Sequence, residues 1–249
     1  MLQNVRYNKI LEQIQRQNSV RVTDLAEELG VSESTIRRDI NDLDKAGQLR
    51  KVFGGAVANR SDIIGLESDV MTRETLNVEE KNAIARYAAS IINDDDFIFI
   101  DAGTTTARIV DFLESKKATI VTNGVPLAMK LIQSGFRSYM IGGELKLSTE
   151  AVVGTDAVES LKKYNFTKCF IGTNGIDTER GYTTPDIDES MVKTTVINQS
   201  YVSYILADHS KFGLITSVSF ADIREACIIT DHVTDKKYIK HTIVKEVGK

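Results

Sequence analysis

The stretch that decides the fold is Val22-Thr-Asp-Leu-Ala-Glu-Glu-Leu-Gly-Val-Ser-Glu-Ser-Thr-Ile-Arg-Arg-Asp-Ile-Asn-Asp-Leu-Asp-Lys45. In its first part, apolar residues recur at i, i+3, i+4 and i+7, at Val22, Leu25, Ala26 and Leu29. This spacing predicts a short helix over 23–29, with one buried face and Thr23 as its cap. Gly30 tolerates a positive φ and would end the helix, and Ser32 would cap a second one over 33–45. Two helices at this spacing are typical of a helix-turn-helix.

The second predicted helix has an apolar stripe and an opposite polar face. The stripe consists of Ile36, Ile40 and Leu43. The polar face and its flanks carry Ser34, Thr35, Arg37, Arg38, Asn41 and Lys45. Such side chains hydrogen-bond base edges and phosphates in the major groove of DNA. Adjacent cations such as Arg37 and Arg38 are more often an ordinary solvated surface. Here the turn, the cap and the apolar spacing all agree, and they favour DNA binding.

The segments on either side complete this first domain. Gln48-Leu-Arg-Lys-Val-Phe-Gly-Gly-Ala-Val57 alternates and contains two adjacent glycines, which predicts a small β wing. We expect Arg50 and Lys51 of this wing to contact the DNA backbone. A first amphipathic helix over 1–17 would pack its apolar face across the other two helices, through Tyr7, Ile10, Leu11 and Ile14. The sequence therefore predicts a winged helix-turn-helix over 1–57.

Composition sets limits on the whole chain. Its 249 residues are 42% hydrophobic and 27% charged with a net charge of −4, enough for one small and one medium domain. No apolar run approaches the roughly eighteen residues of a membrane span, and the amino terminus lacks a secretion signal, so we expect a cytoplasmic protein without membrane contact. Both cysteines lie in apolar runs, which predicts buried, unpaired thiols at Cys169 and Cys227. His209, His232 and His241 show no ligand spacing, so no metal site is expected.

Charge is distributed unevenly along the chain. Residues 1–57 carry nine Lys and Arg against eight Asp and Glu, a net charge of +1, whereas 58–249 carry a net charge of −5. The basic charge is therefore local to one face of the first domain, and affinity for DNA must depend on a few contacts.

The second half of the chain alternates strands and helices. An irregular stretch predicts a linker over 58–78 and a second domain over 79–249. Apolar runs predict five strands, at 97–100, 118–122, 138–141, 168–171 and 201–207. Helical spacing predicts segments at 81–92, 105–113, 125–133, 156–164 and 188–198. Continuous apolar strands that alternate with helices indicate a mostly parallel sheet covered on both faces, so the second domain is predicted to be α/β.

Polar residues follow each predicted strand, where a parallel sheet places its ligand site. The first strand is followed by Asp101, Gly103, Thr104, Thr105 and Thr106 at the start of a helix, an arrangement that favours an anion. The next loops contain Asn123, the pair Gly142 and Gly143, and the segment 172–175. The fifth strand precedes Asp208 and Lys211, and Glu189 and Lys193 share one face of a predicted helix. Alone, each motif is commonly a helix cap or a solvated ion pair. Together they predict a cleft for a small phosphorylated ligand.

Six motifs in series resemble the DeoR family of bacterial transcriptional regulators. They are Arg37-Arg38-Asp39, Gly54-Gly55-Ala56, Asp101-x-Gly103-Thr104-Thr105, Thr122-Asn123, Gly142-Gly143 and Asp208-x-Ser210-Lys211. The resemblance implies a winged helix-turn-helix joined to a sensor domain similar to sugar-phosphate isomerases of the ribose-5-phosphate isomerase kind. It further implies a repressor of a sugar-catabolic operon whose effector is a phosphorylated sugar or polyol. Phe53 departs from the pattern, because many relatives carry histidine before the two glycines.

The same resemblance implies roles for single residues. Gly103, Thr104 and Thr105 would hold the phosphate, and Lys211 would balance its charge. The sugar hydroxyls would face Asp101, Asn123, Glu189 and Asp208. We expect a homo-oligomer, dimer or tetramer, that binds double-stranded operator DNA and has neither a cofactor nor an enzymatic activity. Two alternatives stay open: a sugar-phosphate isomerase-like enzyme with an appended DNA-binding head, and a chromosome-binding protein without sequence preference.

Overall fold

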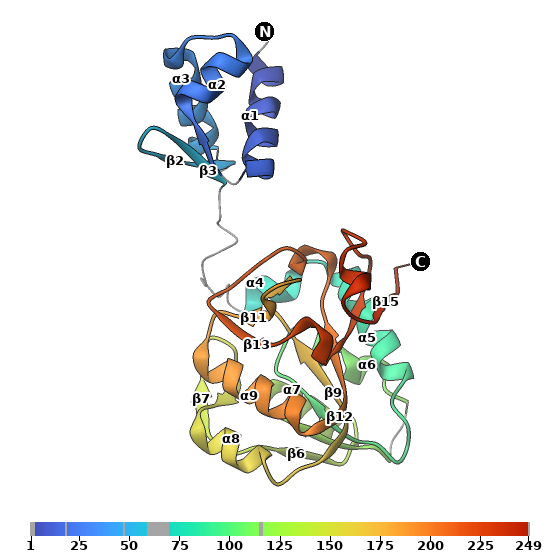
Figure 1. The fold of residues 1–249 in the computed structure, drawn as a ribbon. Helices are drawn as coiled ribbons and strands as arrows, with labels where there is room; N and C mark the ends of the chain where they lie inside the picture. The colour runs from blue at the N-terminus through green and yellow to red at the C-terminus, as the bar shows by residue number, and fades with distance from the viewer. Residues whose placement is uncertain (1–2, 18, 47, 59–69, 115–116, 249) are drawn as a thin grey trace. The chain divides into compact units, whose positions relative to one another are not determined.

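The computed structural model describes residues 3–17, 19–46, 48–58, 70–114 and 117–248 (Figure 1). The chain divides into two compact units, residues 1–64 (unit 1) and 65–249 (unit 2). Within the described ranges, no helix is long and apolar enough to cross a membrane.

Unit 1 is a three-helix core with a small antiparallel sheet. Its elements are α1 (Gln3–Gln17), β1 (Ser19–Arg21), α2 (Val22–Leu29), α3 (Glu33–Lys45), β2 (Leu49–Val52) and β3 (Gly55–Ala58). The strand order is β1-β3-β2, so the predicted β2–β3 wing gains a third strand that the sequence analysis missed. Strand β1 is only three residues long, too short for a periodic signal. The winged helix-turn-helix prediction is confirmed.

Of the two predicted helix caps, the one at Ser32 is confirmed and the one at Thr23 is not. Ser32 accepts the backbone N–H of Thr35, and Gly30 adopts the left-handed conformation at φ 63°, both as predicted. The Thr23 cap is wrong. Helix α2 begins at Val22, immediately after β1, and the hydroxyl of Thr23 donates to its neighbour Asp24 instead (2.9 Å). The tight join between strand and helix leaves no room for a side-chain cap.

The core of unit 1 forms where the predicted stripes meet. Its buried side chains include Ile10, Ile14, Val22, Leu25, Leu29, Ile36, Ile40 and Leu43. Helix α1 is also tied to α3 by an ion pair between Arg6 and Asp39, whose side chain is almost fully buried. A buried charge needs such a partner, because removing it from water is costly.

Unit 2 is built on a seven-stranded sheet in which all neighbours are parallel. Its strands are β4 (Phe97–Ile100), β5 (Thr119–Thr122), β6 (Ser138–Met140), β9 (Phe166–Gly172), β12 (Ser200–Leu206), β14 (Cys227–Thr230) and β15 (Val244–Glu246). They lie in the order β15-β14-β12-β9-β4-β5-β6. The first five strands along the chain, β4, β5, β6, β9 and β12, correspond to the five predicted strands. The last two strands along the chain, β14 and β15, were not predicted, and no long helix separates them.

Helices cover both faces of this sheet, as the α/β prediction requires. They are α5 (Val78–Ser90), α6 (Ile109–Phe112), α7 (Val125–Gln133), α8 (Thr155–Leu161) and α9 (Ile187–Asn198), with short 3₁₀ turns η2 (Thr106–Arg108), η3 (His209–Lys211), η4 (Ile223–Glu225) and η5 (Tyr238–Lys240). Successive residues of β4 point to opposite faces. Phe99 packs with residues of α8 and α9, whereas Ile98 and Ile100 pack with residues of α5, α6 and α7.

Smaller elements frame the carboxyl edge of the sheet. A hairpin of β7 (Glu144–Lys146) and β8 (Ala151–Val153) and a three-stranded sheet of β10 (Gly175–Asp177), β11 (Gly181–Thr184) and β13 (Val218–Ala221) were not predicted. Of the expected linker, residues 59–69 lie outside the described residues. The rest includes helix α4 (Val70–Thr75) and the first residue of α5.

The two cysteines carry free thiols in different surroundings. Cys169 is fully buried in β9, and burial raises the pKa of its thiol to about 11. Cys227 is only partly buried, so the prediction of a buried thiol is wrong there. It lies at the first position of β14, where the strand has just emerged from the surface turn η4.

Candidate functional site

Helix α3 presents a polar surface opposite its buried stripe. Ser34, Arg37, Arg38 and Lys45 are exposed, and Thr35 and Asn41 are partly buried. The Thr35 hydroxyl lies 2.9 Å from that of Ser32, so it belongs to the helix cap. Arg37 forms an exposed ion pair with Glu33 (2.9 Å). Within the described part of the chain, Arg38 has no hydrogen-bond or ion-pair partner, so its five N–H groups are free for a ligand.

The wing is joined to this helix by polar contacts. Lys51 donates from its ammonium group to the Asn41 carbonyl (2.7 Å) and from its backbone N–H to Asp44 (2.8 Å). Arg50 beside it is exposed. At the tip, Phe53 is fully exposed and Gly54 takes a positive φ of 80°. The eight predicted DNA-binding residues therefore lie on one helix and one hairpin, with an aromatic ring at the tip in place of the expected histidine.

In unit 2, the strand order reverses between β4 and β9, which is where such a sheet opens a ligand crevice. A cavity of approximately 100 Å³ lies there. It is lined by nine of the twelve predicted effector residues, namely Asp101, Gly103, Thr104, Thr105, Thr106, Glu189, Lys193, Asp208 and Lys211. These residues come from the ends of β4 and β12 and from α9, so the fold alone brings them together.

An ion pair forms part of the cavity wall at the switch point. Asp101 follows β4 and is almost fully buried; it accepts hydrogen bonds from the Lys193 ammonium and from the backbone N–H of Gly172 (3.0 Å). Lys193 also donates to the Gly172 carbonyl (3.0 Å). Burial raises the pKa of Asp101, although Lys193 opposes that effect. The pair places a buried anion and cation side by side in the cavity.

The loop after Asp101 offers free donors. In the described chain, the backbone N–H groups of Gly103, Thr104 and Thr105 and the two threonine hydroxyls have no hydrogen-bond acceptor. Thr106 differs, because its buried hydroxyl donates to the carbonyls of Asp101 (2.6 Å) and Gly103 (3.0 Å) and so shapes the loop. The predicted helix over 105–113 is two short pieces, η2 and α6, which weakens the expected helix-dipole contribution.

Cations supply positive charge at this loop. Burial lowers the pKa of Lys81; Asp208 raises it, and Lys211, Arg108 and Arg73 lower it further. Lys81 donates to the backbone carbonyl of Arg73. The ammonium group of Lys211 has no hydrogen-bond or ion-pair partner among the residues described. Sequence reasoning missed Lys81 and Arg73, because their helices reach the cavity only through the tertiary fold; the one available signal was a lysine on the apolar face of the predicted helix 81–92.

The carboxylates on the cavity wall are held in place by neighbouring donors. Glu189 accepts hydrogen bonds from Lys146 (2.9 Å) and Thr149 (2.8 Å). Burial opposes its ionisation, yet Lys193 and Lys146 hold the pKa of Glu189 below its ordinary value. Asp208 is almost fully buried and accepts from Asn77 (3.0 Å) and from the backbone N–H of Ser210 (3.0 Å). Thr149, Asn77 and Ser210 also line the cavity; none of them was among the predicted effector residues, although Ser210 belongs to one of the six motifs.

Three predicted effector residues do not line the cavity. Asn123 is buried, accepts the backbone N–H of Ala102 (2.8 Å) and so supports the threonine loop from behind. Gly142 and Gly143 lie on the exposed connection between β6 and β7. Strand β6 is the last strand of the sheet, so its end lies three strands away from β9.

Comparison with known proteins identifies both units. Residues 6–62 match the DeoR-like helix-turn-helix domain, and residues 76–232 match the DeoR C terminal sensor domain. The chain therefore belongs to the DeoR family of DNA-binding transcriptional regulators, and the family resemblance seen in its motifs is confirmed.

Individual relatives match along nearly their whole length. The HTH-type transcriptional regulator FruR of Bacillus subtilis is 41% identical over 99% of both chains. The HTH-type transcriptional regulator IolR of the same organism is 33% identical over 98% of this chain and 97% of its own. The lactose phosphotransferase system repressor of Staphylococcus aureus is 32% identical over 95% of both. Among solved structures, ribose 5-phosphate isomerase A of Methanocaldococcus jannaschii is 14% identical over 55% of each chain, with a TM-score of 0.41.

Proposed function

We propose that the cavity binds a phosphorylated sugar or polyol and that this ligand controls the affinity of the helix-turn-helix for operator DNA. The observation that carries the proposal is the group of unpaired donors on Gly103, Thr104 and Thr105, close to the cations of the same cavity. Backbone N–H groups, hydroxyls and ammonium groups together are what a phosphate dianion needs.

The rest of the cavity wall carries hydrogen-bond acceptors, which suit the hydroxyl groups of a sugar. Asp101, Glu189 and Asp208 are acceptors that are fixed by other residues, and each carboxylate has lone pairs to spare for ligand hydroxyls. Thr173 and Asn174 add further polar groups to the lining. An unphosphorylated sugar would leave Lys211 without its counter-ion, so it should bind more weakly.

Helix α4 is a physical connection between the cavity and the chain that leads to unit 1. Its carbonyls at Arg73 and Glu74 accept from Lys81 and from Arg108 (3.3 Å), and Arg73 lines the cavity. A phosphate that attracts the Lys81 ammonium competes with the Arg73 carbonyl for it and so changes how α4 is held. Because α4 is the first helix described after residues 59–69, such a change would occur at the amino-terminal end of unit 2.

The chain is proposed to act as a cytoplasmic repressor and as a homo-oligomer. The repressor role is supported by the name of the staphylococcal relative, the lactose phosphotransferase system repressor. Dimeric helix-turn-helix proteins place their recognition helices on half-sites about 34–36 Å apart, which requires at least two chains. The ligand can shift DNA affinity by no more than its difference in affinity for the two arrangements.

Thermal denaturation in the presence of phosphosugars and of their unphosphorylated parents tests the proposal. A ligand at a hundred times its Kd adds about 2.7 kcal/mol of stability to the unit that binds it. Lys211→Met removes the charge at nearly constant length, and we expect it to weaken the active phosphosugar by about tenfold or more. The control is Lys236→Met, an exposed lysine that does not line the cavity. No stabilisation by any phosphosugar, or equal stabilisation by the parents, contradicts the proposal.

The enzyme alternative has its own measurement. Asp101, Glu189 and Lys193 are acid, base and cation in one cavity, and such groups also carry out proton transfers on sugars. We propose that they only bind, because Asp101 and Lys193 are already paired with each other. Steady isomerisation of the stabilising phosphosugar, abolished in Asp101→Asn, would show that the protein is an enzyme.

A further inference from the structure

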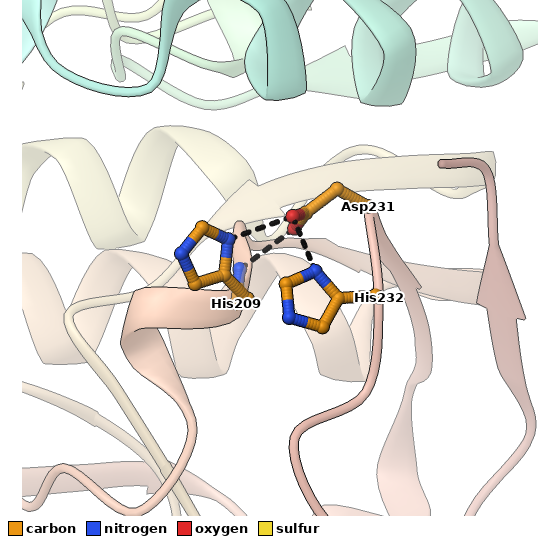
Figure 2. A group of neighbouring side chains, drawn as sticks. All are labelled: His209, Asp231 and His232. Carbon is orange, nitrogen blue, oxygen red and sulfur yellow. Dashed lines mark hydrogen bonds and ion pairs between the residues drawn. The ribbon is translucent and has the colours of Figure 1, made fainter. Parts of the chain in front are cut away.

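Two histidines and an aspartate, His209, Asp231 and His232, lie close together, and none of the three lines the cavity described above (Figure 2). His209 begins η3, and Asp231 and His232 directly follow β14. The Nδ1 atoms of His209 and His232 lie 2.7 Å and 2.9 Å from the same Asp231 oxygen, Oδ2. The two rings are stacked, with centroids 4.5 Å apart. The spacing along the sequence gave no sign of this group, since 22 residues separate His209 from Asp231.

Asp231 is held so that one oxygen faces both rings. Its Oδ1 accepts the backbone N–H of His209 (2.7 Å) and lies 3.3 Å from the Thr230 hydroxyl, which leaves Oδ2 for the imidazoles. Its second oxygen therefore points between the two rings, and a carboxylate oxygen with two imidazole nitrogens is a set of groups that can ligate one ion.

We propose that His209, Asp231 and His232 bind one divalent transition-metal ion through the two Nδ1 atoms and Oδ2. Imidazole nitrogen with carboxylate oxygen is a donor set for ions such as Ni²⁺, Cu²⁺, Co²⁺ and Zn²⁺. The three residues each offer one ligand atom, and these atoms lie within 4.8 Å of one another. The side chains of His209 and His232 are 35% and 57% exposed, so water can reach the site and supply further ligands.

Binding of the ion replaces the hydrogen bonds between the rings and Asp231. The Nδ1–Oδ2 distances of 2.7 and 2.9 Å are those of hydrogen bonds, in which each Nδ1 can carry the proton. When Nδ1 binds the ion, the proton of each neutral imidazole lies on Nε2, so charge and protons balance. Ni²⁺ and Cu²⁺ bind imidazole nitrogen strongly, and Ni²⁺ is therefore a suitable probe.

The position of the site has a consequence for the cavity, and this part rests on the proposed function. His209 lies between Asp208 and Lys211 in a single turn. An ion that joins His209 to the end of β14 would fix that turn and with it the Lys211 ammonium. We therefore expect Ni²⁺ to change phosphosugar affinity in wild type and not in a variant that lacks the ion site.

Titration of the full chain, without a histidine tag and after treatment with a chelator, tests ion binding directly. Ni²⁺ should bind with a stoichiometry of one ion per chain by calorimetry. His232→Gln removes a ligand whose side chain is 57% exposed and should weaken this binding by at least about tenfold. His241→Gln, an exposed histidine outside the group, should leave it unchanged. Equal affinity of wild type and His232→Gln, or equal losses in both variants, would overturn the proposal.

A second measurement on wild-type protein does not depend on the variants. Paramagnetic Ni²⁺ should broaden the imidazole NMR signals of His209 and His232 at ion concentrations that leave those of His241 sharp. Uniform broadening of all three histidines would mean non-specific association and would overturn the proposal. Failure of the phosphosugar screen leaves this result intact, because the ion is measured without that ligand.

Discussion

Lys193 places its ammonium group against the buried carboxylate of Asp101 and so ties the middle of α9 to the carboxyl end of β4. The side chains are only 7% and 2% exposed, so neither charge has much contact with water. The strand order of the sheet reverses between β4 and β9, and the cavity lies at that point. The pair therefore fixes one wall of the cavity where it opens.

Removing one partner of this pair should be strongly destabilising. Lys193→Met leaves Asp101 as a buried carboxylate without its cation, which costs about 3–5 kcal/mol. Urea unfolding of the full chain measures the loss. The double variant Asp101→Asn with Lys193→Met removes both charges and should recover part of it. A single variant as stable as wild type would mean that the pair contributes nothing.

The same variant should depend on pH in a defined direction. Burial already raises the pKa of Asp101, and loss of Lys193 raises it further. A carboxyl whose pKa is higher in the folded state stabilises that state below its unfolded pKa, and the contribution is lost as pH rises through the folded pKa. The destabilisation by Lys193→Met should therefore shrink as the pH falls from neutral. A constant difference would argue against a charged, unpaired Asp101.

Asp96 should affect the pH dependence in the direction opposite to Asp101, so that its contribution to the free energy of unfolding is lost at low pH. Burial opposes ionisation of Asp96, but the backbone N–H of Asn93, Lys168 and Thr167 hold its pKa below the ordinary value. Asp96→Asn should cost about 1–3 kcal/mol at neutral pH. The wild-type advantage is present above the unfolded pKa near 3.8 and is lost as the pH falls through the folded pKa. Urea unfolding across this range checks it.

The control for this prediction is a surface pair on the same loop. Asp94 pairs with Lys117 at 2.8 Å, but the side chains are 53% and 79% exposed. Water screens such a pair, so Asp94→Asn should cost less than about 1 kcal/mol. Equal losses at the two positions would show that burial of Asp96 does not matter.

Arg38 should contribute to DNA affinity without affecting the fold. It is exposed on α3, and Arg38→Ala should weaken operator binding by about tenfold or more while unfolding and phosphosugar binding stay unchanged. If Arg38 contacts a phosphate, the slope of log K against log salt should fall by about 0.9. Fluorescence anisotropy at several salt concentrations measures both. Arg180→Ala, an exposed arginine of unit 2, is the control and should bind DNA normally.

The third strand of the wing sheet can be tested at a glycine. A Cβ on Gly55 would lie 2.0 Å from the Val20 carbonyl oxygen, so Gly55→Ala must separate β3 from β1. We expect a loss of about 1–3 kcal/mol in urea unfolding followed by circular dichroism. Gly54 needs its positive φ of 80° but has open space, and Gly54→Asn should cost well under about 1 kcal/mol because Asn adopts that conformation readily. A larger loss of stability in Gly54→Asn than in Gly55→Ala would contradict the close approach of Gly55 to the Val20 carbonyl.

Much of the fold was predictable because its signals are local. Helix α3 and its Ser32 cap, helix α7 and strand β4 each follow from periodicity and turn residues within about a dozen positions. Prediction failed where a strand was too short to show a period, as in β1, or where a neighbouring strand replaced a cap, as at Thr23. The cavity was partly predictable, because parallel strands place their carboxyl ends at one edge.

By itself, the sequence determined the order of elements, the helix-turn-helix and the α/β class, because these depend on spacing between near neighbours. Only the tertiary structure decided which polar groups meet. Lys81 and Arg73 reach the cavity, Gly142 and Gly143 stay outside it, and His209 joins His232 across Asp231. These outcomes depend on the strand order and on packing between residues far apart in the chain, which no local pattern encodes.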